Sequence, residues 1–234
     1  MKILFSKKSP EQVINDEKKS IFCFFNLHNI WWIKKSKLYS EISLDQHVHL
    51  FPDGKIISRI LGIPQERGPS FTKRYLKNPI SIKKKHFFLG LEKEELSKIS
   101  EITKIPSKQI FPYHSEFTKN KNLLILPPEE VKKISSLINK HKSEYVWLGI
   151  SSTKQEFIAN QLFDRTNVNF FICIGAGKDF LLKKKKESPR VFTTIGLEWL
   201  YRLMTDFKHS KQKVLRSFLA LFYIITKKVE LRSE

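Results

Sequence analysis

Short apolar runs rich in aromatic residues recur along the chain, and longer segments with one polar face separate them. Such runs are typical of strands, and a run without polar interruptions is typical of a strand buried on both faces of a sheet. The runs that we interpret as strands are IFCFF (21–25), HVHLF (47–51), HFFLG (86–90), QIFPY (109–113), YVWLG (145–149) and NFFICIG (169–175).

Between these runs lie segments whose apolar residues recur three and four positions apart, which predicts amphipathic helices. They cover residues 9–19, 92–104, 127–142 and 153–163. In the first of them we expect Ser9 as the helix cap and Pro10 at the first helical position. The alternation of strands and helices predicts an α/β fold, a three-layer, mostly parallel sheet with helices on both faces. We assign residues 1–190 to this domain and residues 191–234 to a helical C-terminal appendage.

The chain of 234 residues carries 43 lysines and arginines against 23 acidic residues, a formal net charge of +20. This charge favours anionic partners, which include nucleic acid, an acidic membrane surface and phosphorylated substrates, but it selects none of them by itself. The lysines are dispersed and no recognised RNA- or DNA-binding motif accompanies them, so we expect no nucleic acid. A basic nucleic-acid-binding protein is kept as an alternative function.

Nothing in the sequence predicts a membrane-spanning or secreted protein. The apolar part of MKILFSKKSPEQ is too short for a signal peptide, and no run reaches the roughly 18 apolar residues of a spanning helix. Cys23 and Cys173 lie in apolar runs without Cys-x-x-Cys spacing, which favours two buried thiols over a metal or redox pair. We therefore expect a cytoplasmic protein that at most lies on a membrane.

Small or polar residues follow four of the predicted strands. They are Asn26, Pro52-Asp53-Gly54, Gly149-Ile150-Ser151 and Gly175-Ala176-Gly177. Open α/β sheets bind their ligands beyond the carboxyl ends of the strands, and these residues suit tight turns around a ligand. The functional site is therefore expected at this edge.

Two residues near this edge have both an ordinary and a functional interpretation. Asp53 lies in FPDGK, where Pro-Asp-Gly is a common turn sequence and aspartate is a good helix cap. Alternatively, its carboxylate takes a proton from an attacking hydroxyl. Arg67, in GIPQERGPSF, is either a surface arginine or a guanidinium that holds a diphosphate through two contacts.

Lys154, Gln155 and Glu156 open the helix after YVWLG, where free backbone N–H groups suit a phosphate or sugar oxygens. Several enzyme classes lack their motifs. GISSTKQE is not a phosphate-binding loop of the P-loop kind, and IGAGKD lacks the third glycine of a dinucleotide fingerprint. The sequence also contains no Asp-x-Asp pair, no zinc-ligand spacing and no Gly-x-Ser-x-Gly nucleophile elbow.

The stretch GLEWLYRL (196–203) begins the appendage. Glu198 and Arg202 are four residues apart, as in an ordinary surface ion pair. Cationic residues follow, and then the apolar run FLALFYII (218–225). A basic helix that leads to an apolar patch fits a segment lying on a membrane surface, and it fits equally a helix docked on the sheet.

These motifs occur in one order along the chain: FPDGK, ERGPS, HFFLG, YVWLGISSTKQE, ICIGAGKDF and SPRVFTTIGLEWLYRL. Together they resemble the WecG/TagA/CpsF glycosyltransferase family from about residue 20 to about residue 216, and KQE and GLEWLYRL are specific to it. The resemblance implies an inverting, metal-independent transfer of a hexose or N-acetylhexosamine-type sugar from a UDP-sugar to a polyprenyl-diphosphate-linked acceptor in cell-surface polysaccharide synthesis. It implies no cofactor.

The resemblance also implies roles for individual residues. Asp53 matches the aspartate of the family's Asp-Gly motif and is the implied general base. The implied substrate-binding residues are Asn26, Arg67, Gln155, Glu156, Asp179 and Arg202. Arg202 matches the first of several arginines on an appendage that closes over the site at the membrane.

The expected partners are a UDP-sugar donor, a polyprenyl-diphosphate-linked sugar acceptor and an anionic membrane surface, which places the protein at the inner face of the cell membrane. A homo-oligomer that buries the apolar tail is compatible with the sequence. The chain departs from the family pattern at Phe24, Thr153, Lys178, His209 and Gln212. These departures leave open a second alternative, a catalytically impaired relative that acts as a partner protein.

Overall fold

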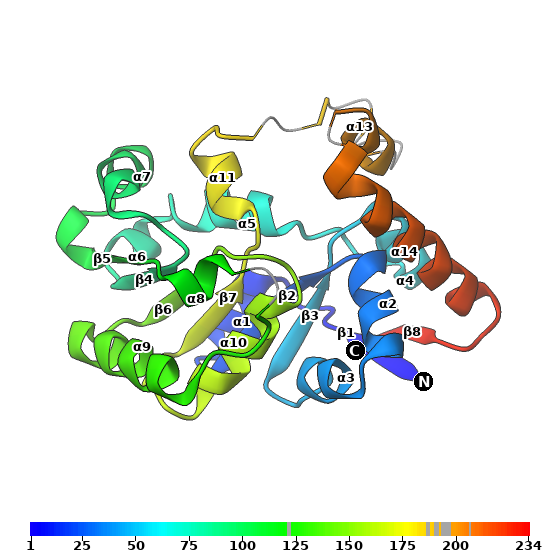
Figure 1. Ribbon diagram of the computed structural model, residues 1–234, viewed down its shortest axis with the longest axis horizontal. Coiled ribbons are helices and arrows are strands. Elements are labelled where there is room, and N and C mark those ends of the chain that lie inside the picture. Colours follow the sequence, from blue (N-terminus) through cyan, green and yellow to red (C-terminus); the bar gives the residue numbers. More distant parts are fainter. Residues whose placement is uncertain (121–122, 186–187, 190–191, 193–197, 206) are drawn as a thin grey trace.

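A computed structural model describes residues 1–120, 123–185, 188–189, 192, 198–205 and 207–234, apart from the side chains at 198, 199, 202, 208 and 209. The described chain forms a six-stranded parallel sheet between two layers of helices, with a two-stranded sheet beside it (Figure 1). The predicted three-layer α/β fold is confirmed.

The strands of the main sheet coincide with the six apolar runs. They are β2 (Ser20–Phe25), β3 (Val48–Pro52), β4 (His86–Leu89), β5 (Ile110–Tyr113), β6 (Tyr145–Leu148) and β7 (Phe170–Cys173). They pair in the order β3-β2-β7-β6-β4-β5, and every pairing is parallel. Cys23 thus has both Leu50 and Cys173 as register partners. The sequence pattern predicted the strands but not this order.

Each face of the sheet packs against its own set of helices. Helices α2 (Leu27–Lys35), α3 (Lys37–Ser43), α9 (Pro128–His141) and α10 (Lys154–Phe163) cover one face. Helices α1 (Pro10–Asn15), α5 (Gly68–Tyr75), α7 (Leu96–Thr103) and α11 (Gly177–Leu181) cover the other. The short connecting elements are α4 (Lys55–Leu61), α6 (Pro79–Ile82), α8 (Glu116–Lys119) and the 3-10 helices η1 (Lys93–Glu95) and η2 (Ser107–Gln109). As predicted, Ser9 caps α1 and Pro10 begins it.

The hydrophobic core is divided between these two faces because successive side chains of a strand point to opposite sides. In β2, Ile21, Cys23 and Phe25 belong to the first core, whereas Phe22 and Phe24 belong to the second. Both thiols of the chain are free and buried, as the sequence predicted.

The two ends of the chain meet in a second, smaller sheet that the sequence pattern did not predict. Strand β1 (Lys2–Phe5) pairs in parallel with strand β8 (Glu230–Ser233). Before β8 lie α13 (Glu198–Thr205) and α14 (Phe207–Ile225), and α14 packs along α2 with Ala220 buried (Figure 1). Among the described residues, no helix is both long and apolar enough to cross a bilayer. The predicted boundary after residue 190 falls outside the described residues.

The contact between the ends of β4 and β6 requires glycine at position 90. Gly90 has a φ of +97°, and a Cβ atom there would lie 2.7 Å from the carbonyl oxygen of Gly149. We expect Gly90→Ala to lower the free energy of unfolding by about 2–4 kcal/mol, because it adds both backbone strain and a clash. Gly62→Ala is the matched control, since Gly62 has a φ of +66° with nothing within 4 Å and should lose only about 1 kcal/mol. Urea denaturation measures both, and equal losses would contradict the close approach.

Candidate active site

The carboxyl ends of four neighbouring strands gather the residues that the sequence singled out. Strands β3, β2, β7 and β6 are adjacent in that order and parallel. Asp53 follows β3, Asn26 follows β2, Gly175 lies just beyond β7, and Ser151 lies beyond β6. Segments up to about 150 residues apart in the sequence therefore meet at one edge of the sheet, as the rule for open α/β sheets predicts.

Backbone contacts hold Asp53 and the segment of Arg67 close to the end of β2. The Asp53 N–H donates to the Phe25 carbonyl at 2.8 Å, and the Glu66 N–H donates to the Pro52 carbonyl at 3.0 Å. Arg67 is the N-cap residue of α5. The side chains of Asp53 and Arg67 are both half-buried. The two residues thus begin successive structural elements on the same side of the sheet edge.

Phe24 explains how the first turn of α5 reaches this edge. A Cβ atom at Gly68 would lie 3.3 Å from the Phe24 ring and 3.6 Å from the Ile174 carbonyl oxygen. The start of α5 therefore packs directly on β2 and on the residue after β7. The departure from the family pattern at position 24 fills a packing position, and its ring contacts Phe51 and Phe71.

Asn26 caps α2 and begins a chain of polar contacts across the edge. Its side-chain oxygen accepts from the His28 N–H at 3.0 Å, and its own N–H donates to Asn29 Oδ1 at 3.2 Å. Asn29 Nδ2 in turn donates to Tyr39 Oη at 3.0 Å and to Ser152 Oγ at 3.3 Å. The contacts connect the end of β2 with the loop that follows β6. Sequence reasoning missed Asn29 and Tyr39, although asparagine three residues after an asparagine cap was a readable capping signal.

Gln155 connects the start of α10 to the end of β7. Its Oε1 accepts from the Gly175 N–H at 2.7 Å, and its Nε2 donates to Glu156 Oε1 at 3.0 Å. Both side chains are buried, Gln155 at 4% exposure and Glu156 at 2%. The amide of Gln155 is thus oriented by one contact on each side, and one of its N–H groups remains for another partner.

Glu156 is a carboxyl group in an apolar and neutral setting. Its Oε2 is buried and has no hydrogen-bond partner among the described residues. Burial raises the pKa of Glu156 to about 7, although the hydrogen bond from Gln155 acts in the opposite direction. Burial also raises the pKa of the nearby Tyr39 hydroxyl well above its ordinary value, with the Glu156 charge adding to the effect. Near neutral pH a large share of Glu156 is therefore protonated and uncharged.

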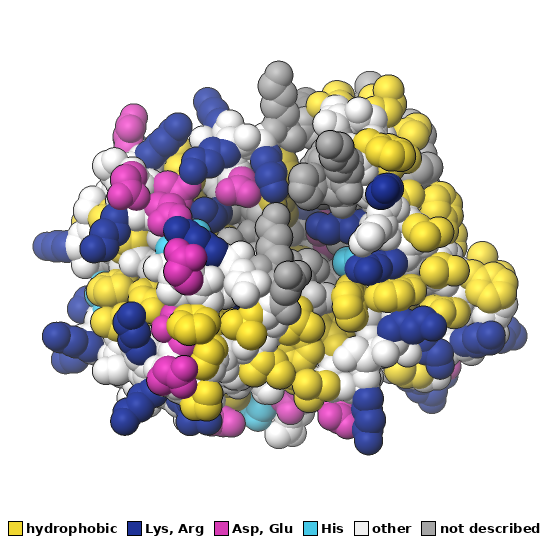
Figure 2. Space-filling view, in the orientation of Figure 1, with side chains coloured by type: hydrophobic (Ala, Val, Ile, Leu, Met, Phe, Trp, Pro, Cys, Tyr) yellow, Lys and Arg dark blue, Asp and Glu magenta, His cyan; other side chains and the backbone are white. Residues whose placement is uncertain are grey.

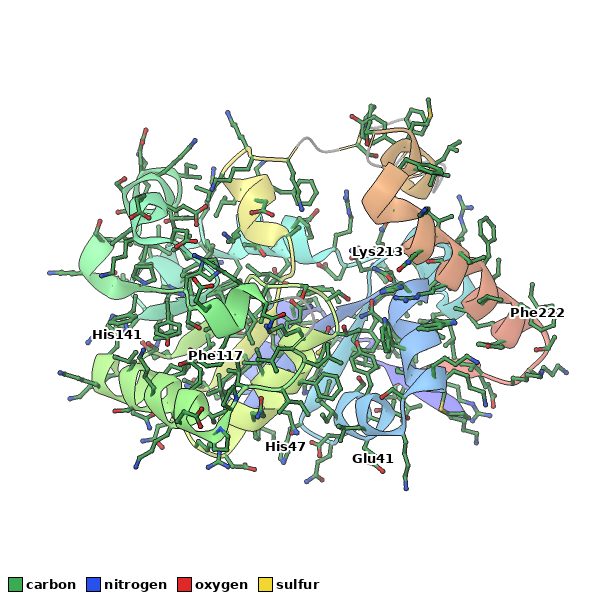
Figure 3. All side chains as sticks on the ribbon, in the orientation of Figure 1. Glu41, His47, Phe117, His141, Lys213 and Phe222 are labelled. Carbon is green, nitrogen blue, oxygen red and sulfur yellow. The ribbon has the colours of Figure 1, made fainter. Side chains whose placement is uncertain are left out.

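Lys154 holds a loop in place and does not face the open edge. Its side chain is fully buried, and its Nζ donates to the carbonyl oxygens of Phe117, Thr118 and Asn120 (Phe117 is labelled in Figure 3). These contacts tie α8 and the residue after it to the first turn of α10. Lys154 therefore stabilises the fold by joining α8 to α10, and its ammonium group is occupied by these carbonyl oxygens.

Asp179 belongs to a group of ion pairs on the β4 side of the edge. Its carboxylate lies 3.4 Å from Lys185 Nζ and 3.9 Å from Lys178 Nζ. Lys178 also pairs with Glu95 at 3.2 Å, and Lys184 pairs with the same carboxylate. Burial alone would raise the pKa of Glu95, but the hydrogen bond from Lys184 and the nearby Lys178 charge lower it below its ordinary value. Glu95 was missed in the sequence, where it read as an ordinary helix-entry acid.

The appendage contributes α13 and α14 next to this edge. Arg202 lies in α13, but its side chain and that of Glu198 are outside the described residues, so the predicted role of Arg202 and its pairing stay predictions. On α14, the guanidinium carbon of Arg216 lies 4.6 Å from the centre of the Trp31 ring and 5.3 Å from that of Trp32. Lys213 projects beside the start of α2 (Figure 3). Helix α14 is thus docked on α2 and not directly on the sheet, and the interpretation of its outer face as a membrane-surface segment stays a prediction.

The fold is that of an α/β protein whose predicted site residues gather at the carboxyl edge of its sheet. Comparison with known protein families gives a match to the glycosyl transferase WecG/TagA/CpsF family over residues 7–234. The match covers nearly the whole chain, so the protein belongs to this family. The family indicates a glycosyltransferase of cell-surface polysaccharide synthesis.

The structure brings five of the seven predicted site residues to one edge without assigning their roles. Asn26 and Asp53 directly follow β2 and β3, and Gln155 and Glu156 lie in the first turn of α10 after β6. Arg67 is the N-cap residue of α5, and the contact of Glu66 with Pro52 holds it near the end of β3. Asp179 begins α11 beyond β7 but is engaged in ion pairs. In the described part of the chain, no three His, Cys, Asp or Glu side chains are placed to hold a metal ion.

The raised pKa of Glu156 predicts a pH dependence of stability. The folded protein binds this proton more tightly than the unfolded chain, whose glutamates titrate near 4.5, so the contribution is full below pH 4.5 and is lost as the pH rises to about 7. Glu156→Gln removes the titrating group and keeps the hydrogen bond from Gln155. We expect its effect on the free energy of unfolding to be more favourable at pH 8 than at pH 4.5, by up to about 3 kcal/mol. Urea unfolding of both proteins across this range measures the difference, and parallel profiles would contradict the assignment.

Proposed function

We propose that this chain is an inverting glycosyltransferase that moves a hexose or N-acetylhexosamine-type sugar from a UDP-sugar to a polyprenyl-diphosphate-linked acceptor without a metal ion. The observation that carries the proposal is the meeting of Asp53, the Arg67 segment and Gln155 at one sheet edge, in a chain that belongs to the WecG/TagA/CpsF family. A proton acceptor, a cation and an oriented amide are the groups that this reaction needs.

The reaction is a direct displacement. Asp53 takes the proton from the acceptor hydroxyl while the hydroxyl oxygen forms a bond to the anomeric carbon of the donor. The bond from that carbon to the UDP oxygen breaks on the opposite face, so the configuration inverts. Arg67 and Arg202 offset the charge of the diphosphate groups in the place where other transferases use a divalent ion.

The donor enters the polar half of the edge. In the described part of the chain, Gln155 uses one of its two side-chain N–H groups for Glu156, which leaves the other for a sugar or phosphate oxygen. Asn26 lies at the end of the neighbouring strand β2. Because Glu156 is buried and partly protonated near neutral pH, it places no full negative charge beside the incoming diphosphate. Asp179, with Lys178 and Lys185, lies toward β4 and contributes to the rim of the same site.

The appendage suits a protein that works at the surface of an anionic membrane. Its exposed apolar side chains are Met204, Phe207, Leu215, Phe218, Leu219, Phe222 and Ile225. Figure 2 shows hydrophobic side chains along the edge where Figure 1 places α13 and α14, with cationic side chains among them. Apolar residues that enter the interface, together with lysines that attract anionic headgroups, are the features of a helix lying on a bilayer. We therefore assign residues 191–234 to a membrane-associating appendage and the protein to the inner face of the cell membrane.

Replacing Asp53 by Asn tests the general base. We expect the turnover number to fall by roughly 10²–10⁴-fold, because the amide cannot accept the proton, while the affinity for UDP changes little. The measurement is UDP release with a panel of UDP-sugars and a short-chain polyprenyl-diphosphate-linked sugar, beside UDP binding by calorimetry. Asp16→Asn, at an exposed aspartate paired with Lys8, is the control and should leave both unchanged. Near-normal turnover of Asp53→Asn would remove Asp53 from this role.

The same measurements on the unmodified chain test the alternative function. Intact UDP binding without any transfer by the unmodified chain would favour a catalytically impaired relative.

Membrane association is tested with Leu215→Ser/Phe222→Ser. We expect the affinity for anionic vesicles to fall by tenfold or more, because two apolar side chains no longer enter the membrane interface. The affinity is obtained from the fraction of protein that sediments with the vesicles. Leu38→Ser/Ile80→Ser removes two equally exposed apolar side chains from α3 and α6 and should have little effect. Equal losses in the two variants would contradict the assignment of the appendage to the membrane.

A further inference from the structure

A buried carboxyl group lies beside the amide of Gln155 and takes no direct part in the proposed reaction. Glu156 is 2% exposed, and its Oε1 accepts from Gln155 Nε2 at 3.0 Å. Its Oε2 has no hydrogen-bond partner among the described residues. In the described part of the chain, the hydrogen bond that Glu156 makes to another side chain is therefore the one with Gln155.

The surroundings of this carboxyl group are neutral. The titratable groups near it come from three neighbouring elements and are Tyr39 of α3, Cys23 of β2 and Cys173 of β7. Burial raises the pKa of each of them, so all three are uncharged near pH 7. The contacts that lower the pKa of Glu156 come from Gln155 and from backbone N–H groups, and burial outweighs them. Among the described residues, Glu156 thus has no cation to neutralise, and an ion pair does not explain its presence.

The contact with Gln155 also decides where the neutral acid carries its proton. Because Oε1 accepts from the amide, the proton of the neutral form lies on Oε2. Burial raises the pKa of Glu156 to about 7, so both forms are populated at neutral pH. Oε1 stays an acceptor in both forms, and Gln155 therefore meets the same partner whether Glu156 is charged or not.

The amide of Gln155 is fixed in one orientation by this contact and a second one. A side-chain amide can exchange its oxygen and nitrogen by a half-turn unless its partners distinguish the two atoms. The Gly175 N–H donates to Gln155 Oε1 at 2.7 Å and can only donate, whereas Glu156 Oε1 can only accept. A rotated amide would lose both contacts. The second N–H of Gln155 therefore has one direction, and it can bind only an acceptor atom.

We propose that Glu156 is a positioning residue, whose Oε1 fixes the amide of Gln155 so that the second N–H of Gln155 donates to an oxygen atom of the UDP-sugar. The acceptor atom is a phosphate oxygen or a sugar oxygen. Glu156 supports this substrate contact without making one itself. The identity of the ligand rests on the proposed function, whereas the orientation of Gln155 by Glu156 does not.

Two variants of Glu156 separate the acceptor from the rest of the side chain. Glu156→Met removes the acceptor and keeps a similar volume, whereas Glu156→Gln keeps Oε1. For the UDP-sugar of the panel that binds most tightly, we expect the affinity to fall by about tenfold in Glu156→Met, because the Gln155 amide loses one of its two orienting contacts. In Glu156→Gln it should fall by less than about threefold.

Calorimetry with UDP and with this UDP-sugar measures both variants. A loss with both ligands assigns the contact to the diphosphate, and a loss with the UDP-sugar alone assigns it to the sugar. An unchanged affinity of Glu156→Met, or equal losses in the two variants, would overturn the proposal.

A second buried carboxyl group provides the matched control. Glu130 of α9 is 4% exposed and accepts from Tyr113 Oη at 2.8 Å. Helix α9 covers the same face of the sheet as α10. Glu130→Met and Glu130→Gln should change the affinity for the UDP-sugar by less than about twofold, and urea denaturation checks that all four variants are folded. Equal losses in Glu130→Met and Glu156→Met would indicate a general effect of lost packing and would contradict a positioning role.

The side-chain amide of Gln155 gives a measurement that needs no ligand. Its two N–H resonances, assigned by their absence from Gln155→Met, should shift between about pH 5.5 and about pH 8.5, because a carboxylate is a stronger acceptor than a neutral acid. In Glu156→Gln they should not shift over this range. Resonances that stay fixed in the unmodified protein would also overturn the proposal.

These measurements distinguish failure of the positioning role from failure of the proposed function. If Asp53→Asn keeps full turnover while Glu156→Met weakens binding, the proposed base fails and the role of Glu156 stands. If no UDP-sugar binds to the unmodified chain, the proposed function fails, and the amide resonances alone decide whether Glu156 orients Gln155.

Discussion

The parallel hydrogen bonding of β2 between β3 and β7 is the constraint on which the site depends. Since parallel strands all end at the same edge, this pairing brings Asp53, Asn26 and Gly175 together although about 150 residues separate the first and last of them. The next pairing, of β7 with β6, adds the loop before α10 and hence Gln155. Two hydrogen bonds then hold the residues at this edge in place. The Asp53 N–H donates to the carbonyl at the end of β2, and the Gly175 N–H donates to Gln155. The site is therefore a product of sheet topology more than of any one loop.

Periodicity and apolar runs were enough to predict the six strands, the capped helix at Ser9 and Pro10, and the edge at which the polar residues lie. The strand order could not be predicted this way, because four of the six strands are buried throughout and the apolar patterns do not distinguish neighbours. The strands β1 and β8 were missed for a related reason. Each has only four residues, and each is held by the other end of the chain, which local pattern does not record. The structural role of Lys154 was not predicted either, since a lysine at a helix start gives no local sign that three carbonyl groups of a distant loop will surround it.

Departures from the family pattern become intelligible as local packing. Phe24 fills the space against the first turn of α5, and the stem of Lys178 lies against Gly149 while its ammonium group reaches Glu95. Thr153 stands before α10 with a φ of +70°, a conformation that proline cannot adopt, so a proline at this position would require a different entry to the helix. In each case the substituted side chain lies beside the sheet edge and changes how the elements there are held. Glu156 is not one of these departures, and its buried carboxyl group has one oxygen without a hydrogen-bond partner among the described residues.

The ladder between β1 and β8 has a consequence for how the polypeptide matures during synthesis. Its register joins Lys2 with Glu230 and Phe5 with Ser233, so residues 2–5 acquire these partners only after residues 230–233 have been synthesised. The six central strands lie between residues 20 and 173 and can form their contacts earlier. A pairing of such high contact order closes slowly and late. A nascent chain can therefore complete the central sheet while β1 still lacks β8, and the end of α14 is joined to the second sheet once β8 has formed.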